Sequence, residues 1–221
     1  MSYYHTFNKH NNLKYKFNNS ENIEKNYSQA FQDMFALTVL EGKTSGTFLD
    51  IGCHDPEFHN NTYLLEKLYG WNGFGIDLNQ EILTKYQNNR KAEAVCADAV
   101  NFDYSEVLNK FDVIDYLSLD IDPPHQSLAA LYKIFSYNKH IKVITFEHDA
   151  YIAGDKVRAE SRAFLQEHYD LIVPNAMTHN SEYYEDWWCH KSLNIGNKFA
   201  NCKLNEKNMP LDFFYMISFS I

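Results

Sequence analysis

The sequence predicts an α/β domain whose doubly wound, mostly parallel sheet ends in an antiparallel pair of strands. Short apolar runs alternate with helical stretches over most of the chain, which is the spacing of βαβ units on a parallel sheet. The last two strand-like runs have no helix between them. The chain has 221 residues, of which 45% are hydrophobic, and can therefore close one full core.

Each element follows from its local pattern. The first helix, over residues 28–40, carries apolar side chains at Phe31, Met34 and Phe35 and ends near Gly42. The run 113–119 is apolar almost throughout, which is typical of a strand buried on both faces. The same criteria predict the other strands at 47–51, 73–76, 94–97 and 142–146, and the other helices at 62–69, 80–88, 104–109, 126–135 and 155–168.

The two ends of the chain are less regular. Residues 1–27 are polar and aromatic without a clear period, so we expect an N-terminal arm before a single domain over 28–221. The last two strands are expected at 171–173 and 213–219, which leaves an insertion at about 177–210. For the Trp187-Trp188 pair in this insertion, we expect one side chain to plug the core and the other to contact an acceptor molecule.

Composition excludes several classes of protein. The 20 basic and 29 acidic side chains give a net charge of -9, so there is no strong nucleic-acid signal. No apolar run approaches the roughly 20 residues of a membrane span, and the N-terminus lacks the apolar core of a signal peptide. The four cysteines show no CxxC spacing. We therefore expect a soluble, cytoplasmic protein without a membrane partner.

Carboxylates follow three successive predicted strands. Asp50 and Gly52 end the first, Asp77 ends the second about 25 residues later, and Asp98 follows the third. In open parallel sheets, ligands bind at the carboxyl ends of the strands, and an acidic residue there can accept both ribose hydroxyls. The two further glycines of a dinucleotide fingerprint are absent. The pattern indicates a nucleoside with free hydroxyls, although strand-end Asp residues also cap helices.

A set of motifs extends this pattern from residue 28 to about residue 175. They are Ser28-Gln29 with Asp33, Phe48-Leu49-Asp50-Ile51-Gly52-Cys53-His54-Asp55-Pro56, Asn61-Thr62-Tyr63-Leu64-Leu65-Glu66-Lys67, Gly75-Ile76-Asp77-Leu78-Asn79, Asp115-Tyr116-Leu117-Ser118-Leu119-Asp120-Ile121-Asp122 and Val143-Ile144-Thr145-Phe146-Glu147-His148. With them the chain resembles the FkbM-like family of class I S-adenosylmethionine-dependent methyltransferases. It departs from that family at His54-Asp55-Pro56 and at Pro123-Pro124, where small residues and glycine are usual.

The resemblance implies a seven-stranded, Rossmann-like methyltransferase sheet with an antiparallel last strand, and S-adenosyl-L-methionine as cofactor. Asp77 would hold the ribose and Asp98 the adenine. Around the methionine side it places Gln29, Asp50, Gly52, His54 and Asn61, and the cofactor site also takes in Cys53, Leu78, Ala99 and Asp120. We expect a side chain at position 52 to block the cofactor and leave the fold largely intact.

Further acidic and imidazole groups follow the fourth and fifth strands. Because adjacent strand ends lie about 5 Å apart, we expect Asp122, His125, Glu147 and His148 to converge where an acceptor would sit and to include its catalytic base. The predicted reaction is O-methylation of a hydroxyl on a sugar-containing or other small acceptor. Asp120, Asp122 and Glu147 are also candidates to bind Mg²⁺ or another divalent cation.

Two alternatives remain open at this stage. Asp122-Pro123-Pro124-His125 looks like the Asp-Pro-Pro-Tyr loop of amino-group methyltransferases, which favours a nucleobase or another amine as acceptor. The second alternative is a noncatalytic nucleoside-binding domain that has kept the sheet. Arg158 and Arg162 are candidates to contact an anionic acceptor, although solvated positions on a helix are the commoner outcome.

Overall fold

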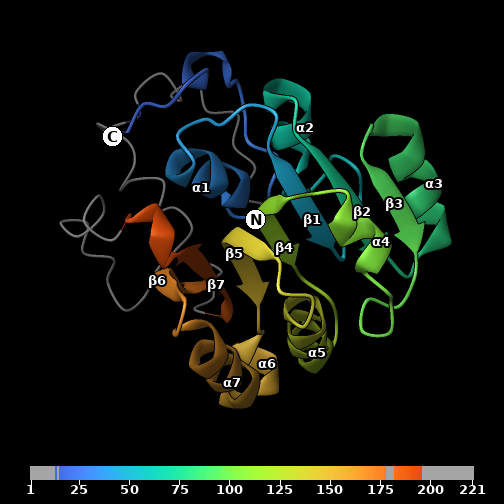
Figure 1. Cartoon of the computed structure of the whole chain (residues 1–221), viewed down its shortest axis with the longest axis vertical. Helices are drawn as coiled ribbons and strands as arrows, with labels where there is room; N and C mark the ends of the chain where they lie inside the picture. The colour runs from blue at the N-terminus through green and yellow to red at the C-terminus, as the bar shows by residue number, and fades with distance from the viewer. Residues whose placement is uncertain (1–12, 14, 178–181, 196–221) are drawn as a thin grey trace.

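The fold is a seven-stranded sheet with helices on both faces, seen in a computed structural model that describes residues 13, 15–177 and 182–195 (Figure 1). The strand order is β3-β2-β1-β4-β5-β7-β6, and β7 runs antiparallel to both of its neighbours. This confirms the predicted fold class. The strands are β1 (Thr47–Ile51), β2 (Asn72–Asp77), β3 (Glu93–Cys96), β4 (Val113–Leu119), β5 (His140–Glu147), β6 (Tyr169–Met177) and β7 (Tyr183–His190).

The helices between these strands follow the predicted order. Asn79 caps α3 by accepting hydrogen bonds from the backbone N–H groups of Glu81 and Ile82. Two short 3-10 helices, η2 (Ser20–Asn22) and η3 (Lys191–Leu193), lie near the ends of the described chain. The α-helices are α1 (Gln32–Val39), α2 (Tyr63–Tyr69), α3 (Gln80–Asn89), α4 (Ser105–Asn109), α5 (Pro124–Phe135), α6 (Ala150–Ala153) and α7 (Asp155–Leu165).

Successive strand residues pack into two separate apolar layers. Phe48 packs with residues of α1, α2 and α3, whereas its neighbour Leu49 packs with residues of α4, α5 and α7. Trp187 and Trp188 divide between the same two layers. Figure 1 shows α1 and α2 on one side of the sheet and α5 and α7 on the other. The alternation is the period of two expected of a strand with both faces covered.

The end of the sheet differs from the expectation. The strand beside β5 is β7, which lies inside the segment that we expected to be an insertion. The predicted strand at 213–219 lies outside the described residues. β7 is paired on both edges, by β5 and β6, and its two faces are buried in the two apolar layers. A polar-looking aromatic run therefore forms an interior strand. Both tryptophans belong to the core, so the prediction that one of them contacts an acceptor is wrong.

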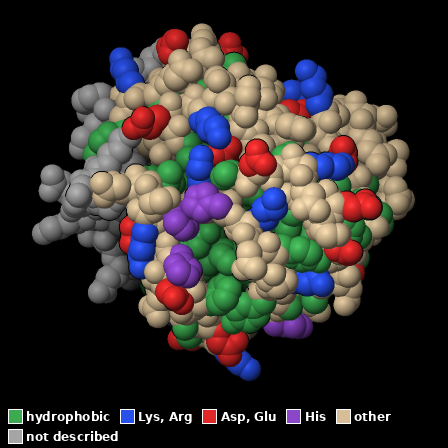
Figure 2. All heavy atoms as spheres, in the orientation of Figure 1, with side chains coloured by type: hydrophobic (Ala, Val, Ile, Leu, Met, Phe, Trp, Pro, Cys, Tyr) green, Lys and Arg blue, Asp and Glu red, His purple; other side chains and the backbone are tan. Residues whose placement is uncertain are grey.

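The described residues of the predicted arm also reach the core. Leu13, Phe17 and Ile23 are buried in the layer that contains α1 and α2. No helix in the described ranges is long and apolar enough to cross a membrane. Acidic and basic side chains are interspersed on the face of the molecule in Figure 2.

Removal of the Trp187 side chain tests its assignment to the core. We expect Trp187→Ala to lower the free energy of unfolding by about 3–5 kcal/mol, because it leaves a large cavity beside Phe35, whose ring lies 5.0 Å away. Urea denaturation measures the change. Phe164→Ala, at a side chain that is 37% exposed, is the matched control and should cost much less. Equal costs would contradict the assignment.

Candidate functional site

The turn after β1 brings two strand ends together. Gly52 has φ +84, and a Cβ atom there would lie 1.8 Å from the backbone oxygen of Asp120, which follows β4. The backbone N–H groups of Gly52 and Cys53 both donate to the carbonyl of Ile76 in β2, at 2.8 and 3.1 Å. Glycine is therefore required for the approach of two backbones. The expectation that a side chain at this position leaves the fold intact is wrong.

Two small clefts open on either side of this turn. The first cleft, of about 120 Å³, is reached by residues from β1, its following loop and β4. Within it, Asn61 Nδ2 donates to Ser118 Oγ at 2.9 Å, while the buried Asn61 Oδ1 has no hydrogen-bond partner. The cleft is lined by Gln29, Asp50, Gly52, Cys53, His54, His59, Asn60, Asn61, Ser118 and Asp120.

The second cleft, of about 150 Å³, lies at the ends of β2, β3 and β4. Asp77 is held by two backbone N–H groups, from His54 at 3.0 Å and Asn79 at 2.8 Å. Asp98 accepts from the backbone N–H of Val100 and from Asn101 Nδ2, and these bonds lower its pKa. The lining is Ile76, Asp77, Leu78, Ala97, Asp98, Ala99, Ile121, Asp122 and Gln126. All eleven residues predicted to bind the cofactor thus line one of the two clefts.

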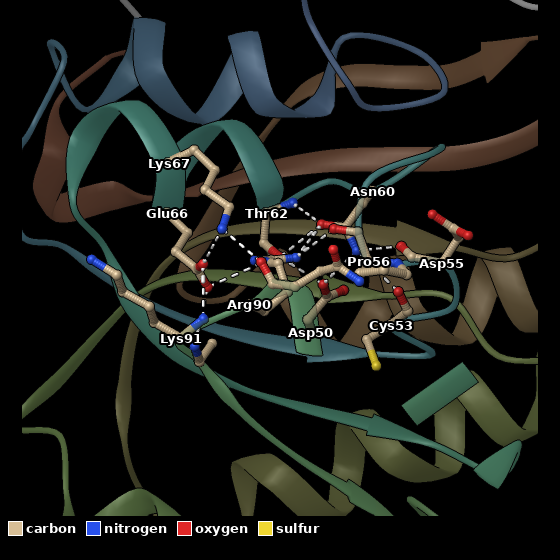
Figure 3. A network of polar contacts seen from close by, with 12 residues as sticks. Asp50, Cys53, Asp55, Pro56, Asn60, Thr62, Glu66, Lys67, Arg90 and Lys91 are labelled. Carbon is tan, nitrogen blue, oxygen red and sulfur yellow. Dashed lines mark hydrogen bonds and ion pairs between the residues drawn. The ribbon is translucent and has the colours of Figure 1, made fainter. Parts of the chain in front are cut away.

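A buried arginine holds the loop that walls the first cleft (Figure 3). Arg90, at the end of α3, donates to Glu66 Oε2 at 3.0 Å, to Asn60 Oδ1 at 2.9 Å and to the carbonyl of Pro56 at 3.1 Å. It also donates to Thr62 Oγ1, which in turn donates to Asp50 Oδ2 at 2.7 Å. We call Asp50, Asn60, Thr62, Glu66 and Arg90 the Arg90 network. The network links β1, α2 and the end of α3 to the loop between β1 and α2, and so holds that loop in one conformation.

Burial and charge act in opposite directions on the carboxyls of this network. Burial opposes ionisation of Glu66, but Arg90 and the backbone N–H groups of Lys91 and Ala92 outweigh it and lower the pKa of Glu66. At Asp50 burial prevails, so that its pKa is raised despite the hydrogen bond from Thr62 and the charge of Arg90.

A second buried carboxyl fixes the chain before α1. Asp33 accepts from the backbone N–H of Tyr27 at 2.7 Å and from Ser28 Oγ at 2.6 Å. Phe31 takes a left-handed backbone, φ 70, so α1 begins at Gln32 and not at residue 28 as predicted. The turn presents Gln29 to the first cleft.

Four carboxyl groups gather beyond the ends of β4 and β5. We call Asp120, Asp122, Glu147 and Asp149 the acidic mouth. Burial raises the pKa of Asp120, Glu147 and Asp149, and the negative charges within the group raise each of them further. Glu147 shares a hydrogen bond with Asp120, and burial together with the charges of Asp120 and Asp149 raises the pKa of Glu147. Asp120 lines the first cleft and Asp122 the second, so the acidic mouth adjoins both.

The predicted catalytic residues do not all meet here. Asp122 and His125 are exposed near the start of α5. His148 is fully buried: its Nδ1 accepts from the backbone N–H of Ala150, and its Nε2 lies 3.6 Å from Asp186 Oδ1. A buried imidazole facing Asp186 cannot reach an acceptor, so the prediction for His148 is wrong.

The metal-binding prediction finds no support in the part of the chain that the structure describes. Among the residues that the structure describes, no three His, Cys, Asp or Glu side chains are arranged to hold a metal ion. Asp120 and Glu147 share a hydrogen bond, and burial raises the pKa of both. The expectation came from the convergence of the ends of the fourth and fifth strands.

Both arginines of α7 bind side chains of this chain, and neither is simply exposed to solvent as the commoner outcome would be. Arg162 donates to both carboxylate oxygens of Asp186, at 2.7 and 2.8 Å, and to Asn175 Oδ1. Burial opposes ionisation of Asp186, but Arg162 and His148 hold its pKa at about 2. Arg158 donates to Asn175 and Asp155. Both arginines therefore serve the structure of β6 and β7.

Sequence reasoning missed several residues around the clefts. Arg90 was not singled out, because an arginine at the end of a helix beside a strand gives no distinctive pattern. Asn60 was not singled out either, and Glu66 appeared only as part of the motif at 61–67. Thr62 was seen only as a helix start. Asn60 had a detectable signal, since it directly follows the loop after β1 and precedes Asn61.

The fold is shared with solved structures of low sequence identity. Fibrillarin from Methanococcus jannaschii, a pre-rRNA processing protein, is 13% identical with a TM-score of 0.51, and the match covers 67% of each chain. A chain of a fibrillarin/Nop5p complex is 12% identical with a TM-score of 0.51 over 81% of this chain and 92% of that one.

A TehB-like S-adenosylmethionine-dependent methyltransferase from Corynebacterium glutamicum is 16% identical with a TM-score of 0.44, over 72% of this chain and 88% of that one. The two fibrillarin matches show a shared fold, the Rossmann-like sheet with helices on both faces. The sequence matches no model of a protein family and no curated protein. The FkbM-like resemblance thus stays a prediction.

The Arg90 network should make the free energy of unfolding depend on pH through Glu66. The pKa of Glu66 is lower in the folded state than in the unfolded state, where it is about 4.3. The contribution of Glu66 to stability is therefore complete above about pH 4.3 and is lost as the pH falls through the folded-state pKa. We expect the stability difference between the wild type and Glu66→Gln to be largest near neutral pH and to shrink below about pH 4.3. Urea denaturation from pH 3 to 7 measures it.

Glu81→Gln, at an exposed position of α3, is the control and should show a much smaller pH-dependent difference. A difference that is constant across this range would show that Glu66 is not ionised in the network.

Alanine substitutions at Gly52 and Gly70 distinguish the cost of a strained backbone from the cost of a steric clash. Gly70 also has positive φ, +66, but no atom lies within 4 Å of a Cβ there, so Gly70→Ala should cost only about 1–2 kcal/mol. We expect Gly52→Ala to cost at least about 3 kcal/mol, because the Cβ would meet the Asp120 carbonyl. Thermal unfolding of the two variants gives the comparison, and equal costs would show that the strands separate easily.

Proposed function

We propose that the protein is an S-adenosylmethionine-dependent methyltransferase. The observation that carries the proposal is the pair of clefts on either side of the Gly52 turn, because these clefts collect all eleven residues expected to bind the cofactor. The class I fold supports it, since ligands of open parallel sheets bind at this edge. The fold supports the class of cofactor, and the clefts support the position at which it would bind.

The donor set of the clefts fits S-adenosylmethionine. Asp77, held by two backbone N–H groups, would accept hydrogen bonds from the ribose hydroxyls, and Asp98 would face the adenine amino group. The exposed Leu78 and the apolar Ile121 give the second cleft the apolar surface that a base needs. In the first cleft, Asn61 Oδ1 would accept a hydrogen bond from the ammonium group of the methionine part.

When bound, the cofactor supplies an electrophilic methyl group on a sulfonium. The protein's part is to align the acceptor and to take a proton from it. Asp122 is exposed at the rim of the second cleft, where it can meet an acceptor that enters from solvent. Asp120 and Glu147 lie deeper and share a hydrogen bond. We therefore assign the acceptor to the acidic mouth.

Two acceptor classes suit a carboxylate that accepts a proton. The sequence predicts a hydroxyl on a sugar-containing acceptor and gives an amine as the alternative, through Asp122-Pro123-Pro124-His125. Both acceptors lose a proton when the methyl group is transferred. The noncatalytic alternative predicts nucleoside binding without transfer, so measured turnover of the cofactor separates it from both.

Calorimetry with S-adenosylmethionine and S-adenosylhomocysteine tests the proposal. We expect both to bind, and Asp77→Ala to weaken S-adenosylhomocysteine by at least about 2 kcal/mol, or about 30-fold, because two buried hydroxyls lose a charged acceptor. Asp77→Asn retains a side-chain oxygen that can accept a hydrogen bond from the loop backbone. It therefore controls for a change in the conformation of the loop. Glu81→Ala on α3 should bind like the wild type. Absence of heat with both ligands would reject the proposal.

A further inference from the structure

A larger pocket, of about 730 Å³, opens at the opposite end of β5 from the cofactor clefts. Residues of α5 and α7, the starts of β5 and β6 and the end of β7 line it. His140 begins β5 and Glu147 ends it, so at about 3.3 Å per residue the pocket lies roughly 23 Å along the sheet from the edge that holds the clefts. A molecule bound in this pocket cannot receive a methyl group at the clefts, so the pocket is a separate site.

Aromatic and imidazole rings form a continuous series along this pocket. Each ring packs edge to face against the next, with centroid separations of 4.4 to 5.9 Å and interplanar angles of 65° to 88°. The series runs through Tyr132, Phe164, Phe135, Tyr169, His190 and His140. In Figure 2, histidine side chains gather beside an apolar patch in the region where Figure 1 shows β5, β7 and α7. Exposed rings in this arrangement offer faces on which a planar ligand can stack.

His190 adds a hydrogen-bond donor to the ring series. Its Nδ1 lies 3.1 Å from the backbone nitrogen of Ser192, and because a backbone N–H can only donate, Nδ1 is the accepting nitrogen. Burial lowers the pKa of His190, and the imidazoles of His140 and His168 lower it further, so the ring is uncharged at pH 7 and carries its proton on Nε2. No described residue accepts a hydrogen bond from this Nε2–H. An acceptor atom of a ligand can therefore take it.

The charges around the pocket do not favour an ion. Its lining contains one lysine and one carboxylate, Lys139 and Glu167, whose charges cancel. Lys139 Nζ donates to the carbonyl of Phe111 at 2.9 Å, and Glu167 lies 3.6 Å from His168. An uncharged ligand needs no compensating charge when it leaves water. The size of the pocket and its mixture of apolar rings with a few polar groups are typical of a site for a small organic molecule.

We propose that this pocket is a second ligand site, which binds an uncharged, planar heteroaromatic molecule of two or more fused rings. The ring series provides the stacking surface, and His190 Nε2–H donates to a nitrogen or oxygen of the ligand. A saturated molecule lacks the flat face, and a fused ring without an acceptor atom cannot use His190. Because the pocket is remote from the clefts, the inference does not depend on the proposed function.

NMR titrations with three neutral probes test the inference. Benzimidazole has a ring nitrogen that accepts a hydrogen bond, indole has the same fused shape without that acceptor, and cyclohexanol is not planar. We expect benzimidazole to shift the imidazole C–H signals of His140 and His190, with a Kd of about 1 mM or below for so small a ligand. Indole should bind about threefold to tenfold more weakly, because one neutral hydrogen bond is lost. Cyclohexanol should leave both signals unchanged.

Four variants locate the binding, and the His140 signal reports it in each of them. Phe164→Ala removes an exposed ring of the series and should weaken both planar probes about fivefold or more. His190→Phe keeps a ring but deletes the donor, so benzimidazole and indole should bind alike. Tyr151→Ala, at an exposed ring of α6 outside the pocket, is the matched control and should bind like the wild type. Asp98→Ala, in the second cleft, should also bind like the wild type.

Several outcomes would overturn the inference. It fails if neither planar probe shifts the signals of His140 and His190, or if cyclohexanol binds as tightly as benzimidazole. It also fails if Asp98→Ala abolishes binding and Phe164→Ala does not, because the probe then occupies the second cleft. If sedimentation shows a dimer that Phe164→Ala converts into a monomer, a second copy of the chain covers this face. The binding of S-adenosylhomocysteine is measured separately, so each of these failures leaves the proposed function standing.

Discussion

The buried guanidinium of Arg90 is the interaction on which the geometry of the site depends. It lies under the loop between β1 and α2, donates to that loop at Pro56 and Asn60, and reaches Asp50 through the hydroxyl of Thr62. Tyr86 covers it, with the ring centre 4.7 Å from the guanidinium carbon. A buried arginine is stable only when its donors are satisfied, so the loop is held in the one conformation that satisfies them.

Buried carboxyls of the sheet are stabilised in two ways, by ion pairs and by neutral hydrogen-bond donors. At the far edge of β4, the two lysines on Asp115 serve stability, and so does Arg162 on Asp186. Glu185 is buried among neutral partners, Gln32 and Trp187, and burial raises its pKa to about 8. Each of these carboxyls finds its partners within the chain, through an ion pair at Asp115 and Asp186 and through neutral donors at Glu185.

Much of the fold could be predicted because alternating strands and helices have simple periods. The strand-end carboxylates Asp50, Asp77 and Asp98 could be placed at one edge, since parallel strands end together. The position of β7 could not, because a strand buried on both faces has no alternation and its neighbours are chosen by tertiary packing. For the same reason the side of the sheet that His148 faces could not be known before β7 was placed. Arg90 lies 40 residues from Asp50, and no local pattern connects them.

Backbone contacts join the turn after β1 to the end of β4. Gly52 approaches the carbonyl of Asp120 so closely that no side chain fits, and the N–H of Asp120 donates to the carbonyl of Ile51 at 2.9 Å. The turn that lines the first cleft is thereby fixed to the first residue of the acidic mouth. The proposed methyl transfer would require the donor carbon and the acceptor atom to be aligned within a fraction of an ångström. Rigid coupling of the two strand ends would provide this alignment without any movement of the sheet, and the loop held by Arg90 completes the wall of the first cleft.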